Sequence, residues 1–467
     1  METLTSWLDT IDDLILGGPV LVPFLVFAGI FLSFGLRFVP WRKWPHAFVT
    51  LWRGRHRRAS DEGELSPFRA LMLSLSATIG VGNIVGVAGA ILLGGPGAVF
   101  WMWVIALLGM AVKFCEATLA VKYRDVTPDG KFVGGPMYYI KNGLGPQWKW
   151  LASLFAIFGI AASFVVGNMI QTNSISINVI RLFEIYQINV PPILMAIALL
   201  FIAAIVLLGG LRHIGAVVGT LVPTMVMLYV IGGLTILALH LDRVPNAFQL
   251  IFSGAFNGQA ATGGFIGTTV AEAIRFGIAR SLLSNEAGLG TSPIAHATAM
   301  VKEPVKQGLI GMLGPFFDTI IICSISALVI LVSDEWLVAD ISHATLTAHA
   351  FDTAMPGNLG TWLVTITLVL FAFSTVLGWC IYGERCAIYL LGYRAALPFR
   401  ILFTFLVPVG VLQELALVWK LAIVLCGLMA LPNLIALLLL SPVVFSMTKE
   451  YFGKPEKADD VRSQSDI

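Results

Sequence analysis

Charged residues are scarce in this 467-residue chain. Asp, Glu, Lys and Arg together make up 12% of it, whereas 57% of the residues are hydrophobic. A soluble protein carries about 25% charged residues, so the composition excludes a water-soluble globular fold. Apolar runs long enough for membrane-crossing helices recur from one end of the chain to the other. The sequence therefore predicts an all-α polytopic membrane protein.

Several catalytic and energy-coupling motifs are also missing. The chain contains no HExxH zinc motif, no GxxxxGK[ST] phosphate loop and no GxSxG nucleophile motif. It has no repeated pore filter, and its five cysteines have no paired spacing, so we assign them neither a disulfide nor a metal. These absences argue against an enzyme, an ATP-driven pump and an ion channel. A secondary active transporter is the leading class.

Hydropathy predicts about eleven transmembrane spans. We place them at 14–36, 68–93, 98–121, 150–180, 191–209, 214–240, 259–284, 307–332, 360–390, 399–415 and 419–445. Lys and Arg gather in alternate loops, and cytoplasmic loops collect these residues. This bias predicts an external N-terminus and a cytoplasmic C-terminus in a plasma membrane, which would be the inner membrane of a bacterium. The loop at 333–358 is expected to form a partly helical external cap.

Two of these spans are interrupted by glycine at matching places. The second contains TIGVGN (78–83) and the seventh contains ATGGFIGTT (261–269). Each glycine costs a helix about 1 kcal/mol relative to alanine, and transporters use such broken helices to expose backbone groups near the midplane. Because the two segments lie five spans apart, they run in opposite directions. The alternative is that the glycines only permit close helix packing, which would suit Gly82 and Gly86.

This pairing predicts the organisation of the chain. We expect two inverted repeats of five helices, at 66–240 and 241–445, preceded by one extra helix and a basic loop in 1–65 and followed by a cytoplasmic tail at 446–467. The same counting pairs the fourth and ninth spans. The fourth carries Asn168, Gln171, Ser174 and Asn178 on one face, and the ninth carries Ser374, Thr375 and Trp379. Interhelical hydrogen bonding is the alternative role for these polar residues.

Asp318 in the eighth span is a carboxylate at membrane depth, and such a group is a functional candidate by default. It would be the first choice for a proton-linked group. It could equally hydrogen-bond the free N–H groups of a broken helix.

Two long stretches carry a resemblance to a known family. GGPGAVFWMWVIALLG (94–109) and SNEAGLGTSPIAHATA (284–299), together with MIQTNS (169–174) and TGGF (262–265), resemble the alanine/glycine:cation symporters, also called sodium:alanine symporters. That family belongs to the amino acid–polyamine–organocation superfamily. The resemblance implies a leucine-transporter-type fold, with the 5+5 inverted repeat plus one N-terminal helix, and Na⁺- or H⁺-driven uptake of alanine or glycine.

The resemblance also implies a binding site. The ion would be held by the hydroxyls of Ser374 and Thr375 and by backbone carbonyls near Ser76, Ile79 and Phe371. The substrate residues it implies are Thr78, Gly80, Gly82, Asn83, Gln171, Gly263, Gly264, Phe265 and Trp379. Among them, the unwound backbone at 80–82 would meet the substrate carboxylate, helped by Thr78 or Asn83. Gln171 would bind a polar group, and Phe265 and Trp379 would close over the methyl group.

The chemistry of this ion site favours Na⁺. Hydroxyl and carbonyl oxygens cannot take up a proton near neutral pH, so proton coupling would need a titratable group close to the substrate. The sequence thus predicts a Na⁺-coupled symporter of a small neutral amino acid, monomeric, in contact with membrane lipid, and without an organic cofactor or a nucleic-acid partner. An H⁺-coupled transporter of another small solute in the same fold is the alternative.

Overall fold

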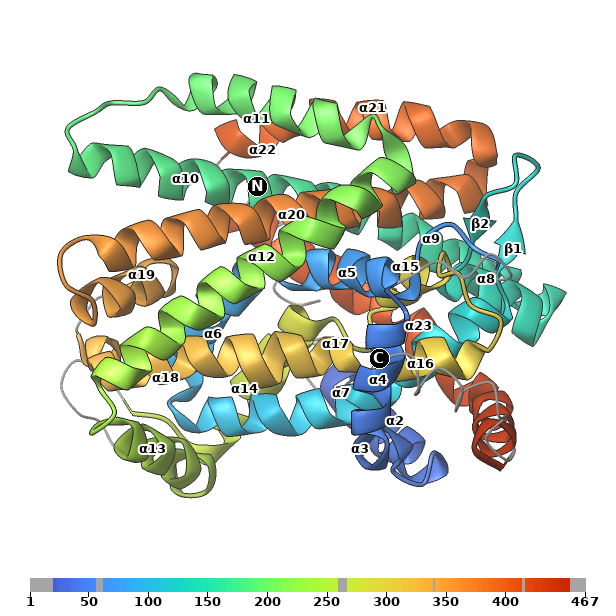
Figure 1. Cartoon of the computed structure of the whole chain (residues 1–467), viewed down its shortest axis with the longest axis horizontal. Helices are drawn as coiled ribbons and strands as arrows, with labels where there is room; N and C mark the ends of the chain where they lie inside the picture. Colours follow the sequence, from blue (N-terminus) through green and yellow to red (C-terminus); the bar gives the residue numbers. More distant parts are fainter. Residues whose placement is uncertain (1–19, 56–61, 259–266, 339–340, 414–415, 454–467) are drawn as a thin grey trace, which may run out of the picture.

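The structure is a computed structural model that describes residues 20–55, 62–258, 267–338, 341–413 and 416–453. It is a bundle of long helices with one small β-hairpin at an end (Figure 1). The elements of the first part are α2 (Leu21–Gly35), α3 (Val39–Arg42), α4 (Trp44–Arg53), α5 (Pro67–Thr78), η1 (Gly82–Gly86), α6 (Val87–Gly94), α7 (Gly97–Lys122), β1 (Asp125–Val126), β2 (Phe132–Val133), α8 (Pro136–Tyr139), η2 (Ile140–Leu144), η3 (Pro146–Trp148), α9 (Lys149–Phe164), η4 (Val165–Met169), α10 (Ile170–Ile185), α11 (Pro192–Leu207) and α12 (Gly210–Leu239).

The second part begins with a short helix at the same end of the bundle as the cap helix α19 (Figure 1). Its elements are α13 (Val244–Asn257), α14 (Val270–Asn285), α15 (Ser292–His296), α16 (Pro304–Gly311), α17 (Leu313–Pro315), η5 (Phe316–Cys323), α18 (Ser324–Ser333), η6 (Glu335–Leu337), α19 (His343–Thr353), α20 (Leu359–Leu391), η7 (Tyr393–Ala395), α21 (Ala396–Phe405), α22 (Val407–Leu412) and α23 (Ala416–Gly453).

The described residues contain seven helical segments that are long and apolar enough to cross a membrane. An eighth is a bent pair, Pro67–Thr78 with Gly82–Gly94, and two shorter apolar helices are Leu21–Gly35 and Pro192–Leu207. The protein is thus a multi-pass helical membrane protein, as predicted, but the predicted count of eleven spans is not confirmed.

The seventh predicted span differs most from the structure. The chain forms α13 before it, which the sequence analysis did not anticipate, and then α14 from residue 270 to residue 285. α14 begins with a capping box, in which Thr269 and Glu272 satisfy each other's backbone N–H groups. Residues 259–266, which include the predicted second break, lie outside the described residues. The predicted helix within 333–358 is present as α19, and its position outside the membrane stays a prediction.

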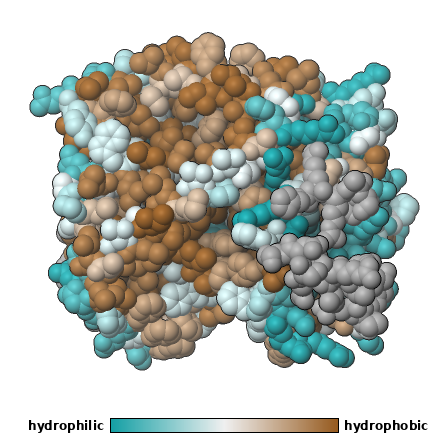
Figure 2. Space-filling view, in the orientation of Figure 1, coloured by the Kyte–Doolittle hydropathy of each residue, from teal (hydrophilic) through white to brown (hydrophobic). Residues whose placement is uncertain are grey.

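The surface shows how the bundle sits in a membrane. Figure 2 shows apolar side chains over the middle of the face and hydrophilic ones toward its left and right edges. Phe201 and Ile205 of α11 are 65% and 74% exposed, and Ile231 of α12 is 64% exposed. Exposing large apolar side chains is favourable in hydrocarbon and unfavourable in water, so these helices face lipid.

Candidate functional site

The second predicted span is broken where the glycine pattern predicted. α5 ends at Thr78, Ile79 is extended (φ −79°, ψ 95°), and the helix restarts as the π-helical turn η1 with a bend of 55°. Asn83 satisfies backbone groups at the break. Its side-chain Oδ1 accepts from Gly80 N–H at 2.9 Å, and its backbone N–H donates to Gly80 O at 3.2 Å. The break is therefore a defined structure and not a frayed end.

The five predicted ion-site residues come together at this break. Ser374 Oγ lies 3.1 Å from Ser76 O and 2.8 Å from Phe371 O. Thr375 Oγ1 lies 3.4 Å from Ile79 O and 3.0 Å from Phe371 O. All five residues are buried, and none of these oxygens belongs to a carboxylate.

The electrostatics of the break suit a cation on one side and an anion on the other. The last carbonyls of a helix lack intrahelical donors and carry the negative end of the helix dipole, and Ser76 O belongs to this last turn of α5. The first N–H groups of η1, near Gly82, carry the positive end. The two helix ends thus present opposite partial charges within a few residues of each other.

Glycine allows α20 to pack tightly against the break. A Cβ at Gly80 would lie 2.6 Å from Thr375 Oγ1, and a Cβ at Gly378 would lie 2.8 Å from Ser76 Oγ. Gly82 and Gly86 behave differently, because an added Cβ would meet nothing closer than 3.6 Å at Gly82 and nothing within 4 Å at Gly86. The close-packing alternative therefore does not explain the glycines of η1, which line a cavity instead.

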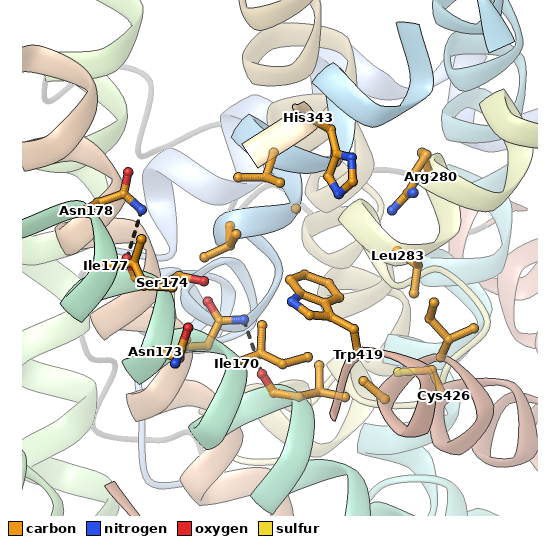
Figure 3. A pocket seen from close by; sticks show the side chains of 18 of the residues that line it. Ile170, Asn173, Ser174, Ile177, Asn178, Arg280, Leu283, His343, Trp419 and Cys426 are labelled. Atoms are coloured by element: carbon orange, nitrogen blue, oxygen red, sulfur yellow. Dashed lines mark hydrogen bonds between the residues drawn. The ribbon is translucent and has the colours of Figure 1, made fainter. Parts of the chain in front are cut away.

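That cavity has a volume of about 300 Å³ and extends from the break to α19 (Figure 3). Its walls come from η1, η4, α10, α14, α19 and α23. Two of these elements are π-helical turns, which often occur at functional sites. The walls are mostly apolar, and the cavity is suited to a small ligand held by a few polar groups.

Gln171 presents an unpaired polar atom to the cavity beside the break, and Asn173 Oδ1, farther along the same wall, is the other lining amide oxygen without a partner among the described residues. The Gln171 side chain is 6% exposed, and its Nε2 donates to Val166 O at 3.1 Å. Its Oε1 has no hydrogen-bond partner and lies 3.4 Å from where a Cβ of Gly80 would be. Burying a carbonyl oxygen without a hydrogen-bond donor costs free energy, so this atom is available to accept a hydrogen bond from a ligand.

The other end of the cavity is basic. Arg181, Arg280 and His343 line it, and no Asp or Glu is among the lining residues in the part of the chain that the structure describes. Burial, with the nearby Arg280 charge, lowers the pKa of His343 below its ordinary value, so its imidazole is neutral at pH 7. Arg181 and Arg280 thus bring two guanidinium groups to this end of the cavity.

Three predicted substrate residues do not face the cavity in this conformation. Thr78 Oγ1 bonds back to carbonyls of its own helix, and the Asn83 amide faces Asp318 and Ser284. Trp379 is 1% exposed, and its Nε1 donates to Glu286 at 3.2 Å. Gly82 and Gln171 do line the cavity, and Gly80 lies beside it. Gly263, Gly264 and Phe265 lie outside the described residues.

Several residues of the cavity wall, Trp419 among them, were not predicted from the sequence. Figure 3 shows the Trp419 indole between Ile170 and Leu283, in the centre of the lining side chains. Trp419 comes from the last long helix, α23. An aromatic residue in an apolar span gives no local signal of its neighbours. The polar stripe of the fourth span was the available signal, and Gln171, Ser174 and Asn178 of that stripe all line the cavity.

Comparisons with known proteins bear on the family and the fold of the chain. The model of the sodium:alanine symporter family matches residues 1–465. The chain is 45% identical to the sodium/alanine symporter AgcS of Methanococcus maripaludis, over 96% of this chain and 97% of that protein. It is 44% identical to an uncharacterised transporter of Haemophilus influenzae, over 97% of each.

Among solved structures, the crystal structure of MhsT in complex with L-phenylalanine matches with a TM-score of 0.53 at 13% identity, over 87% of this chain and 93% of that one. This likeness shows the fold alone, which is of the leucine-transporter type. The family and its relatives are transporters and not enzymes. The chain belongs to the sodium:alanine symporter family.

Proposed function

We propose that the protein couples inward Na⁺ flux to the uptake of alanine or glycine by alternating access. The observation that carries this proposal is the meeting of the Ser374 and Thr375 hydroxyls with the carbonyls of Ser76, Ile79 and Phe371, beside a small cavity. Five neutral oxygens suit a hard monovalent cation, and none of them titrates near pH 7.

The substrate would lie across the break. Its carboxylate would face the positive end of η1 at Gly80–Gly82, and its ammonium group would donate to Gln171 Oε1. This chain has alanine at position 77, before Thr78, so no side-chain carboxylate stands there for the ammonium. The unpaired Gln171 oxygen fills that role in the proposal.

The membrane orientation in this proposal rests on the Lys and Arg residues that gather in alternate loops. We place the N-terminus outside and the C-terminus in the cytoplasm of a bacterial inner membrane, with the protein monomeric among lipids. The cavity, which reaches α19, then opens outward. Residues 66–240 and 241–445 would form the two inverted repeats, with 1–65 and 446–467 as additions.

The proposal is tested by the uptake of labelled alanine into proteoliposomes under an inward Na⁺ gradient, with unlabelled glycine as competitor. Uptake that rises with external Na⁺ and falls with added glycine supports it. Uptake that is independent of Na⁺ contradicts it.

Replacing Gln171 by leucine is expected to raise the KM for alanine about 10-fold. The change removes the acceptor for the ammonium while keeping the bulk of the side chain, and a hydrogen bond to a charged group contributes roughly 1.5–3 kcal/mol. The Na⁺ dependence should persist. Asn178→Ala is the matched control, because Asn178 lines the same cavity but its amide bonds Ser174 O. An unchanged KM in Gln171→Leu would remove Gln171 from the site.

Trp419→Ala is expected to admit larger substrates such as valine and leucine. The indole fills part of the cavity, and exclusion by size gives better selectivity than attraction. Inhibition of alanine uptake by valine should strengthen about 10-fold, as expected for one or two added methyl groups in an apolar pocket. Trp379→Ala is the comparison, because Trp379 lies outside the cavity lining. Continued exclusion of valine in Trp419→Ala would show that another side chain forms the wall.

A further inference from the structure

Asp318 is the centre of a hydrogen-bond network that connects three helical segments. Its Oδ1 accepts from Asn83 Nδ2 at 2.6 Å. Its Oδ2 accepts from Ser284 Oγ at 2.6 Å and from Thr319 Oγ1 at 2.9 Å. The side chain is 0% exposed and does not line the cavity. The Asp318 carboxyl group thus has one amide and two hydroxyl groups within hydrogen-bond distance.

The network fixes the orientation of the Asn83 amide. Its Nδ2 also donates to Ser284 Oγ at 3.0 Å, so the NH₂ group must face Asp318 and Ser284. The Oδ1 atom then faces the opposite way, where it accepts from Gly80 N–H at 2.9 Å. Without the carboxylate, the NH₂ group would keep only Ser284 Oγ at 3.0 Å and the longer contacts to Asp318 O and Cys323 Sγ at 3.4 Å, so the amide would be held less firmly in this orientation.

Gly80 is where the two proposed binding sites meet. Its Cα faces Thr375 Oγ1 and Gln171 Oε1, since an added Cβ would lie 2.6 Å and 3.4 Å from these atoms. A change in the direction of the Gly80 peptide would therefore move the Ile79 carbonyl of the ion site and the backbone that faces the substrate. Sub-ångström errors of this kind weaken a binding site considerably.

We infer that Asp318 is a positioning residue, whose carboxylate orients the Asn83 amide so that it holds the Gly80 N–H and shapes the break for both Na⁺ and the amino acid. This role rests on the proposed function of the break. It gives Asp318 a task other than proton transfer. Because the Gly80 peptide borders both sites, loss of the carboxylate should weaken both kinds of binding together.

Two single variants and their combination test this chain of contacts. In Asp318→Asn the amide can still accept from Asn83 but lacks the charge, so the KM for alanine and the half-maximal Na⁺ concentration should both rise about 10-fold, with the maximal rate within about threefold of the parent. In Asn83→Asp two buried carboxylates face each other, and uptake should fall about 100-fold or more. The double variant Asn83→Asp/Asp318→Asn, called the exchanged variant below, restores complementarity. The amide introduced at position 318 donates to the carboxylate introduced at position 83, which still accepts from the Gly80 N–H.

The exchanged variant should recover at least about 10-fold of the uptake lost in Asn83→Asp, as expected when two contacting residues are coupled. Recovery supports the positioning role. An exchanged variant no more active than Asn83→Asp, or an Asp318→Asn variant with unchanged KM and Na⁺ dependence, overturns it. Thr319→Val is the control: it removes one donor to Asp318 and the acceptor of Asn285 Nδ2 but leaves the Asn83 contact, so both constants should stay within about threefold of the parent.

Hydrogen–deuterium exchange over residues 79–83 gives a readout that does not depend on transport. Exchange should be about 10-fold faster in Asp318→Asn and return toward the parent rate in the exchanged variant. Unchanged exchange in Asp318→Asn contradicts the inference. Absence of Na⁺-driven uptake by the unaltered protein contradicts the proposed function instead, so the two failures are distinguishable.

Discussion

Replacing Ser374 and Thr375 together by alanine is expected to raise the Na⁺ concentration for half-maximal alanine uptake by about 10- to 100-fold. The two hydroxyls are the only side-chain oxygens among the five proposed ligands, and both lie within 3.4 Å of the carbonyls that would complete the site. The loss of one hydrogen bond or ligand contact costs about 1 kcal/mol or more of binding free energy, and about 1.4 kcal/mol corresponds to a factor of ten in the dissociation constant. The measurement is initial uptake rate against Na⁺ concentration.

Thr367→Ala provides the control for this variant. Thr367 is a buried threonine on the same helix, and its hydroxyl donates to carbonyls of its own helix, at Leu363 and Val364. Its removal should leave the Na⁺ dependence unchanged. If the Ser374→Ala/Thr375→Ala variant responds to Na⁺ as the parent does, the ion is bound elsewhere.

Gly80→Ala is expected to lower Na⁺-driven uptake by about 10- to 100-fold. The added methyl group would lie 2.6 Å from Thr375 Oγ1, which is closer than real Cβ contacts, so the Thr375 side chain, the break or α20 must move. Overpacking of this kind costs about 1–3 kcal/mol, and here the strain falls directly on an ion ligand. Uptake at saturating alanine and Na⁺, normalised to the amount of folded protein, measures the effect.

Gly314→Ala is the matched control for Gly80→Ala. Gly314 is a buried glycine of α17, and an added Cβ would meet nothing within 4 Å. This variant should transport like the parent. Parent-like transport by Gly80→Ala would show that the backbone at 79–81 shifts without harm, and that its close approach to Thr375 has no functional importance.

The sequence predicted the first break because a glycine-interrupted apolar segment has an energetic signature that needs no knowledge of neighbours. The two glycines of TIGVGN destabilise a helix, and the structure bends there by 55°. The polar stripe of the fourth span could be recognised for the same reason, since helical spacing places Gln171, Ser174 and Asn178 on one face.

The features of the site that could not be predicted from the sequence depend on packing between distant segments. Trp379 shares a helix face with Thr375, yet it packs toward Glu286 behind the cavity, whereas Trp419 of α23 fills the wall. Asn83 was expected to help bind the substrate, but its amide faces Asp318, 235 residues away in sequence. No local pattern distinguishes these arrangements. The predicted Asp318 contact with a broken helix is present, although through Asn83 and not directly.

The most direct test of the account separates the two coupling ions in proteoliposomes. Under an inward Na⁺ gradient without a pH difference, the protein should accumulate labelled alanine above the external concentration, and a Na⁺ ionophore should abolish the accumulation. Under an inward proton gradient in Na⁺-free buffer, no accumulation should occur, because the five oxygens at the break cannot bind a proton near neutral pH. Accumulation of alanine in the Na⁺-free, proton-driven condition would contradict the account.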